Sequence, residues 1–158
     1  MHLTSVQQTF EQLVSLAIKR EEEAYDFYMK HAKEAEFSSS AKLLEDLAKQ
    51  EEGHKAKLVA ALEEGVCTTF TCDTVEEVEK MDLAQYLVDI PLSPSSGPQD
   101  ILIVAIKKEA GAESFYKALA ELTGSGTHRT IFETMAKEEE GHKNRLQHMY
   151  DDIFQPDM

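Results

Sequence analysis

One short motif occurs twice in the chain, and its two copies restrict the possible fold more than any other feature. Residues 50–55 read QEEGHK, and residues 138–143, 88 positions later, read EEEGHK. Both copies place a glutamate and a histidine three residues apart, a spacing that puts two side chains on one face of a helix. Neighbouring apolar residues mark that same face as buried. The motif therefore predicts two helices that each carry a carboxylate and an imidazole into a protein core.

The similarity between the two halves of the chain extends beyond this motif. Residues 17–21 read AIKRE and residues 105–109 read AIKKE, while Phe27 and Tyr28 align with Phe115 and Tyr116, all at the same offset of 88. We interpret this match as an internal duplication of a helical hairpin.

Composition and apolar periodicity both indicate an all-α fold. The 158 residues include only 4 prolines and 7 glycines, and good helix formers dominate the rest. Apolar residues recur at helical spacing in four segments, at about 5–36, 38–64, 98–123 and 127–153. Each buried stripe is interrupted by acidic or histidine side chains. The stripe of the last segment reads Phe132, Met135, Glu139, His142, Leu146, Met149 and Ile153.

We expect these segments to form a single domain over residues 1–158. Hairpin one would span about residues 5–64 and hairpin two about residues 98–153, joined by a crossover at 65–97 in which residues 74–89 have helical composition. Two hairpins with one long crossover make a four-helix bundle of the ferritin-like kind. A helix of about 25 residues is only about 37 Å long, so the crossover can return along the bundle.

Six polar side chains are predicted to point into this bundle: Glu21, Glu51, His54, Glu109, Glu139 and His142. Four ionised carboxylates in an apolar core would cost several kcal/mol each unless cations accompany them. Two divalent cations carry the charge that neutralises the four carboxylates. A donor set rich in oxygen, with one imidazole for each ion, suits iron, manganese or zinc. One Glu from each of two helices and Glu-x-x-His from each of the other two match the pattern of di-iron and di-manganese bundles.

The duplicated AIK[KR]E and Phe-Tyr segments and the two EEGH segments resemble the ferritin-like diiron-carboxylate superfamily, in particular its rubrerythrin-like branch. The resemblance covers residues 5–153 except for the 65–97 connection. It implies two iron ions, with manganese or zinc as other options. It also implies that Glu51 and Glu139 bridge the two ions, that Glu21 and His54 complete one site, and that Glu109 and His142 complete the other.

Tyr28 and Tyr116 are the candidate catalytic residues. Each lies seven residues after a predicted metal ligand, on the same helix face. They resemble the tyrosines of the family whose hydroxyls bond to ligand carboxylates. The alternative interpretation is that both are ordinary aromatic residues of the core.

The sequence departs from the rubrerythrin pattern in two ways. Rubrerythrins carry a further glutamate three residues after the ligand of the third helix, and this chain has Ala112 there. Glu113 lies one residue further round the helix and could replace that ligand only with altered geometry. Rubrerythrin proper also carries a rubredoxin domain, whereas Cys67 and Cys72 here are the only cysteines and cannot supply four thiolates. We interpret both as reduced, structural or incidental thiols rather than as a functional redox pair.

The net charge of −14 argues against binding to nucleic acids or to anionic membranes. The sequence contains no uninterrupted stretch of about 18 apolar residues, the length that a helix needs to span a bilayer. The first apolar run is broken by Gln and Glu, unlike the core of a signal peptide. We therefore expect a cytoplasmic protein, and the resemblance implies a homodimer.

The resemblance implies a nonhaem diiron oxidoreductase. Its substrate would be hydrogen peroxide or dioxygen, with peroxide favoured, and its electrons would come from a separate rubredoxin-like protein or flavoprotein. One alternative is a ferroxidase that serves iron handling. Another is a metal-binding scaffold without catalytic activity.

Overall fold

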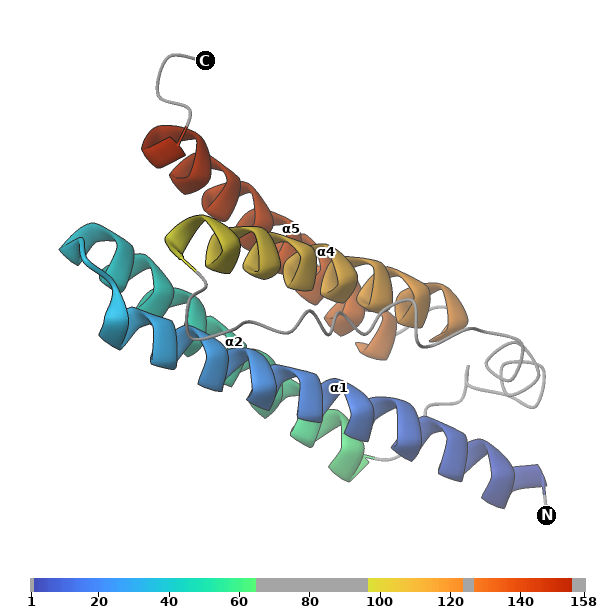
Figure 1. Cartoon of the computed structure of the whole chain (residues 1–158). Helices are drawn as coiled ribbons and strands as arrows, with labels where there is room; N and C mark the ends of the chain where they lie inside the picture. Colours follow the sequence, from blue (N-terminus) through green and yellow to red (C-terminus); the bar gives the residue numbers. More distant parts are fainter. Residues whose placement is uncertain (1, 65–96, 124–126, 155–158) are drawn as a thin grey trace.

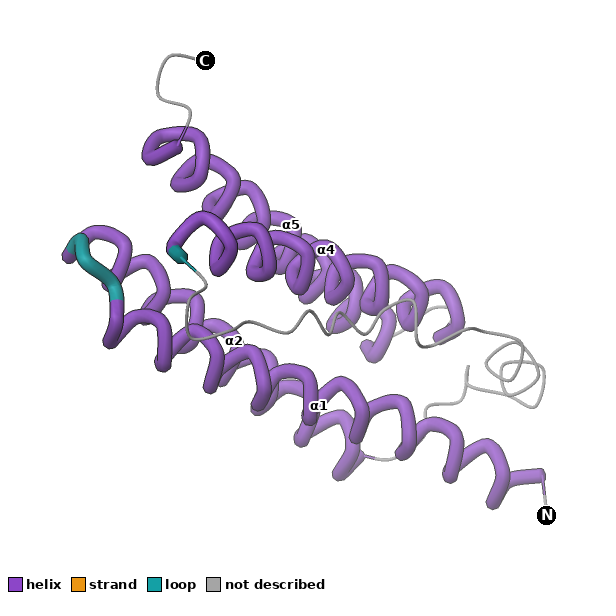
Figure 2. The backbone as a smooth tube through the Cα atoms, in the orientation of Figure 1, coloured by secondary structure: helices purple, strands orange, loops and turns teal. Residues whose placement is uncertain are grey.

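The computed structural model describes residues 2–64, 97–123 and 127–154, which form four helices and no strand (Figure 2). The helices are α1 (His2–Glu34), α2 (Ser38–Glu64), α4 (Pro98–Thr123) and α5 (Thr127–Phe154). The predicted all-α class is confirmed. Apart from Gly97, the crossover expected at 65–97 lies outside the described residues, as do its expected helix at 74–89 and both Cys67 and Cys72.

The helix boundaries follow from local chemistry. The backbone N–H of Ala41 donates to the carbonyl of Phe37 at 3.0 Å, and the N–H of Ile101 donates to the carbonyl of Gly97 at 3.1 Å. Pro98 is the first residue of α4, where a proline is tolerated because that position needs no N–H donor. At its N-terminus α1 begins at His2, slightly earlier than the sequence pattern predicts, and it ends at Glu34 rather than at about residue 36.

The helices pack as two hairpins, with α1 against α2 and α4 against α5, and α2 meets α5 between the hairpins. The members of each hairpin run in opposite directions (Figure 1). The end of α2 and the start of α4 lie at opposite ends of the bundle (Figure 1). This arrangement confirms a four-helix bundle built from two hairpins. No described helix combines the length and the apolarity needed to cross a membrane.

Two apolar clusters fill the bundle. The first combines the N-terminal half of α1 and the C-terminal half of α4 with parts of α2 and α5, and includes Phe10, Leu58, Phe115, Phe132 and Met135. The second lies around the other halves of the helices and includes Tyr28, Leu44, Leu47, Leu102 and Leu146. The motif residues 51–54 and 139–142 lie along the chain between the parts of α2 and α5 that enter these two clusters.

The predicted apolar stripes are largely buried, and the clearest exception is at the end of α5. Ile153 was expected in the core but is 38% exposed, and Met149 is half-buried. Gln99, in the first turn of α4, already donates to the hydroxyl of Tyr150 at 2.8 Å. Phe154, the next residue along α5, packs against the second apolar cluster. The last turn of α5 thus places Phe154 rather than Ile153 against the core.

Replacing Leu58, which has no exposed surface, with Ala should lower the free energy of unfolding by about 2–5 kcal/mol, because a cavity is left in the core. The matched control Ile153→Ala should change that free energy by only about 0.5 kcal/mol, because the side chain is partly solvated. Urea unfolding of the metal-free chain measures both values. Equal losses for the two variants would contradict the assignment of the core.

Candidate metal centre

The six side chains predicted as metal ligands lie together in the middle of the bundle. Each of the four helices contributes at least one of them, and α2 and α5 each contribute a Glu-x-x-His pair. All are at most 2% exposed: Glu21, Glu51, His54, Glu109, Glu139 and His142. The spacing in the sequence is sufficient to explain this within α2 and α5, because residues three apart share a helix face.

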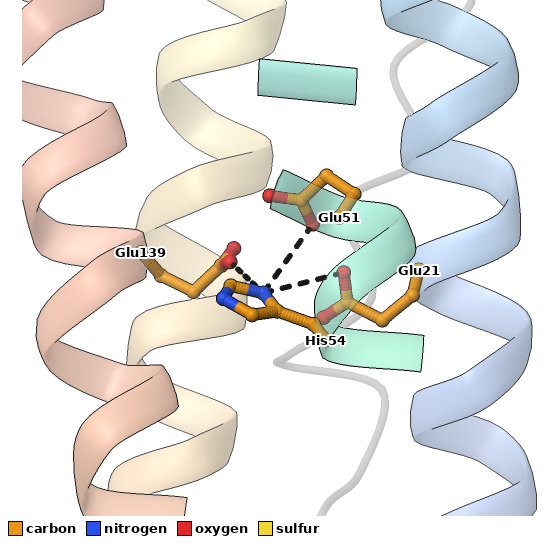
Figure 3. Close-up of side chains that lie close together, drawn as sticks. All are labelled: Glu21, Glu51, His54 and Glu139. Carbon is orange, nitrogen blue, oxygen red and sulfur yellow. Dashed lines mark ion pairs between the residues drawn. The ribbon is translucent and has the colours of Figure 1, made fainter. Parts of the chain in front are cut away.

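One group of donor atoms surrounds the Nδ1 atom of His54 (Figure 3). This nitrogen lies 2.8 Å from Oε1 of Glu139, 3.6 Å from Oε2 of Glu21 and 4.0 Å from Oε2 of Glu51. Each of the four residues offers one donor atom, and these atoms all lie within 4.8 Å of one another. This first donor group therefore combines side chains from α1, α2 and α5.

A second group surrounds the Nδ1 atom of His142. This nitrogen lies 2.9 Å from Oε1 of Glu51, 3.5 Å from Oε2 of Glu109 and 3.7 Å from Oε1 of Glu139. These four residues also offer donor atoms within 4.8 Å of one another. Glu51 and Glu139 belong to both groups, which is the arrangement expected of carboxylates shared by two ions. The two imidazole rings are stacked, with centroids 5.8 Å apart.

The atoms that converge lack hydrogen-bond partners. Each of the six residues has one fully buried polar atom with no hydrogen bond: Glu21 Oε2, Glu51 Oε1, His54 Nδ1, Glu109 Oε2, Glu139 Oε1 and His142 Nδ1. A buried polar atom without a partner costs about 1–3 kcal/mol, and here six of them face one another. A metal ion accepts electron pairs from both carboxylate oxygens and imidazole nitrogens, so the residues fit a pair of such ions.

Both histidines are oriented by an acceptor on the neighbouring helix. The Nε2 atom of His54 is hydrogen-bonded to the carboxylate of Glu138, and the Nε2 atom of His142 to the side-chain oxygen of Gln50. An oxygen acceptor at Nε2 holds the proton there and leaves the lone pair of Nδ1 directed at the cluster, as in metal-bound histidines. Sequence interpretation did not single out Glu138 or Gln50. The available signal was that Gln50 and Glu138 occupy the first position of the motif, which is the only position at which its two copies differ.

The two tyrosines connect the hairpins. The hydroxyl of Tyr28 on α1 donates to Oε1 of Glu109 on α4, and the hydroxyl of Tyr116 on α4 donates to Oε1 of Glu21 on α1. Each tyrosine thus bonds to the glutamate of the opposite hairpin rather than to the one seven residues before it. Burial, together with the neighbouring carboxylates, raises the pKa of both hydroxyls well above the ordinary value. Both tyrosines therefore keep their protons and remain donors.

The carboxylates of the cluster differ in acidity. Burial raises the pKa of Glu51 and Glu139 well above the ordinary value, and the charge of Glu109 raises both further. Burial also acts to raise the pKa of Glu21, but the adjacent Glu51, His54 and Tyr116 side chains outweigh it and lower that pKa. Without cations, the shared carboxylates therefore tend to hold protons.

Glu113, considered above as an additional ligand, is bonded elsewhere. Its carboxylate accepts hydrogen bonds from Nζ of Lys117 at 2.7 Å and from Nζ of Lys143 at 2.8 Å, and it belongs to neither donor group. Burial acts to raise its pKa, but the two lysines outweigh it and lower that pKa. In this structure Glu113 is a charge partner of α5 rather than part of the cluster.

A cavity of about 400 Å³ leads to the cluster from the side where α1 faces α4. Its lining includes the four carboxylates, the small residues Ala24 and Ala112, and the cations Lys19, Arg20 and Lys108. The guanidinium of Arg20 lies over the ring of Phe115 at 5.5 Å, and the ammonium of Lys108 lies over the ring of Phe27 at 5.4 Å. The two contacts are equivalent under the internal duplication, because Arg20 aligns with Lys108 and Phe27 aligns with Phe115. Both contacts hold a positive group beside the buried carboxylates.

The remaining histidines have other surroundings. His31 and His128 are buried and pack edge-on against Phe27 and Phe10, while the side chain of His148 is exposed. His31 and His128 therefore belong to the packing of the bundle rather than to either donor group. Glu52 and Glu140, next to the shared carboxylates in sequence, are exposed.

The metal-free chain should become less stable as the pH rises from about 5.5 to 8. Glu51 and Glu139 have folded-state pKa values above the unfolded value, so their contribution is complete below about pH 4.3 and is lost as the pH rises through the folded values. The lowered pKa of Glu21 changes the stability of the fold only at lower pH, outside this range. Melting temperatures measured in chelator test this, and Glu51→Gln with Glu139→Gln should reduce the slope. A melting temperature that rises steadily over this range would contradict it.

Comparison with known proteins places these features in a family. The family model for rubrerythrin matches residues 2–65 and 100–157. No curated protein matches the sequence directly. The matched ranges contain both hairpins, all six buried polar side chains of the cluster, and both tyrosines. Because the match covers most of the chain, the chain belongs to the rubrerythrin family.

Proposed function

We propose that the chain is a nonhaem diiron oxidoreductase that reduces hydrogen peroxide. The observation that carries the proposal is the pair of donor groups: two sets of buried, unpartnered oxygen and nitrogen atoms that share two carboxylates. Membership of the rubrerythrin family supports the same conclusion.

In this proposal each residue of the cluster has a defined role. Glu21 and His54 hold one iron ion, Glu109 and His142 hold the other, and Glu51 and Glu139 are shared. When bound, two iron ions supply two electrons and Lewis acidity. Tyr28 and Tyr116 act on ligand carboxylates rather than on the ions. Their hydroxyl bonds keep Glu109 and Glu21 turned toward the cluster.

The cavity supports a small substrate. Its lining combines the carboxylates of the cluster with the small residues Ala24 and Ala112, and side chains longer than alanine at these two positions would reduce its volume. Reduction of one hydrogen peroxide to two waters consumes two electrons and two protons. The electrons come from a separate donor protein, rubredoxin-like or a flavoprotein.

The metal-free chain should bind about two iron(II) ions when it is reconstituted without oxygen, because each donor group offers four ligands. Glu51→Ala combined with Glu139→Ala should reduce this value to near zero, since both residues belong to both groups. The matched control is Glu52→Ala with Glu140→Ala, which removes the same charge from exposed neighbours and should leave about two. Elemental analysis gives the stoichiometry. A double variant of Glu51 and Glu139 that still binds about two ions would refute the site.

Mixing the reduced, iron-loaded chain with peroxide should oxidise it faster than mixing it with dioxygen at equal concentration. Stopped-flow absorbance measures both rates. Comparable oxidation by dioxygen, with the iron retained by the chain, would instead assign a ferroxidase. A chain that binds iron but is oxidised by neither reagent would be a metal-binding scaffold.

A further inference from the structure

The duplicated motif is identical in its two copies except at the first residue, and the structure gives that difference a chemical meaning. Gln50 begins one copy and Glu138 begins the other. Across the contact between α2 and α5, Glu138 bonds to Nε2 of His54 and Gln50 bonds to Nε2 of His142. The two imidazoles therefore have the same hydrogen-bond geometry but different partners, a carboxylate for one and an amide for the other.

A carboxylate and an amide act differently on an imidazole. Both accept the Nε2 proton and leave Nδ1 free to donate its electron pair. The carboxylate also carries a full negative charge, which raises the basicity of the ring nitrogen opposite. His54 thus becomes the stronger donor, although the two histidines are buried to nearly the same extent, at 1% and 2% exposed.

The carboxylate of Glu138 is held in place by α2. Its Oε2 atom bonds to His54, and its Oε1 atom lies 3.6 Å from Nζ of Lys57, one turn further along that helix. The side chains of Lys57 and Glu138 are 46% and 37% exposed, so water screens both charges. Because Glu138 bonds directly to His54 while Lys57 reaches only the other oxygen of that carboxylate, Lys57 offsets only part of the effect of Glu138. Glu138 therefore retains the charge that distinguishes it from Gln50.

We infer that Glu138 is a positioning residue that makes the two halves of the centre unequal, so that the half with Glu21 and His54 binds its metal ion more tightly than the half with Glu109 and His142. This inference rests on the proposed metal site. It goes beyond the proposed reaction, because it assigns an order of loading to two sites that the duplication would otherwise make equivalent.

Titration of the metal-free chain with cobalt(II), followed by its visible absorption, tests the inference without any catalytic turnover. The unmodified chain should bind two ions in two separate steps. Glu138→Gln makes the two motifs identical and should weaken the tighter step by about 10–100-fold, so that the two steps merge. Gln50→Glu should tighten the weaker step. Glu140→Gln is the matched control, because it makes the same change at an exposed residue of the same helix.

The single-histidine variants identify the halves. His142→Ala leaves the half with His54, and in this background Glu138→Gln should lower the cobalt affinity, whereas in the His54→Ala background it should not. If the chain binds two cobalt ions and Glu138→Gln behaves like Glu140→Gln, the inference is wrong and the metal site stands. If the unmodified chain binds no cobalt and no iron, both the metal site and the inference are wrong.

Discussion

The structure depends on the electrostatic cost of four carboxylates buried in the centre of a helical bundle. Glu21, Glu51, Glu109 and Glu139 are each at most 2% exposed, and isolated charges at such depth cost several kcal/mol each. Two effects available to the chain reduce this cost. The shared carboxylates, whose pKa values are raised by burial, can hold protons, and cations at the two donor groups would compensate the remaining charge. The helices must therefore be arranged around a polar layer rather than around a continuous apolar core.

The surrounding packing keeps this polar layer in register. Apolar clusters lie around both ends of the bundle, and the tyrosine hydroxyls bond across from one hairpin to the other. Because each tyrosine packs in an apolar cluster while its hydroxyl reaches the polar layer, the core and the centre cannot shift independently. The internal duplication explains the symmetry of these contacts, since the bond from Tyr28 on α1 to Glu109 on α4 has its counterpart in the bond from Tyr116 on α4 to Glu21 on α1.

Departures from this symmetry are where the two halves can acquire different properties. Gln50 and Glu138 occupy equivalent positions but give the two histidines different hydrogen-bond acceptors. Glu113, whose equivalent in the first half is Tyr25, is bonded to Lys117 and Lys143. Ala24 and Ala112 preserve the symmetry and line the cavity. The carboxylate that rubrerythrins carry at the position of Ala112 would lie at this cavity.

The amino-acid sequence by itself determined the helices, the duplication and the six polar residues, because helical periodicity is local: residues three or four apart share a face whatever packs against it. Tertiary structure alone decided which atoms meet. The bond of Tyr28 to Glu109 rather than Glu21 and the bond of Glu138 to His54 depend on how helices from different hairpins are aligned. The bond of Glu113 to Lys143 depends on how α4 and α5 are aligned within one hairpin. Such alignment is set by the packing of whole helix faces. Ile153 gives the same lesson, because its spacing fits the apolar stripe of α5, yet the structure packs Phe154 against the core and leaves Ile153 exposed.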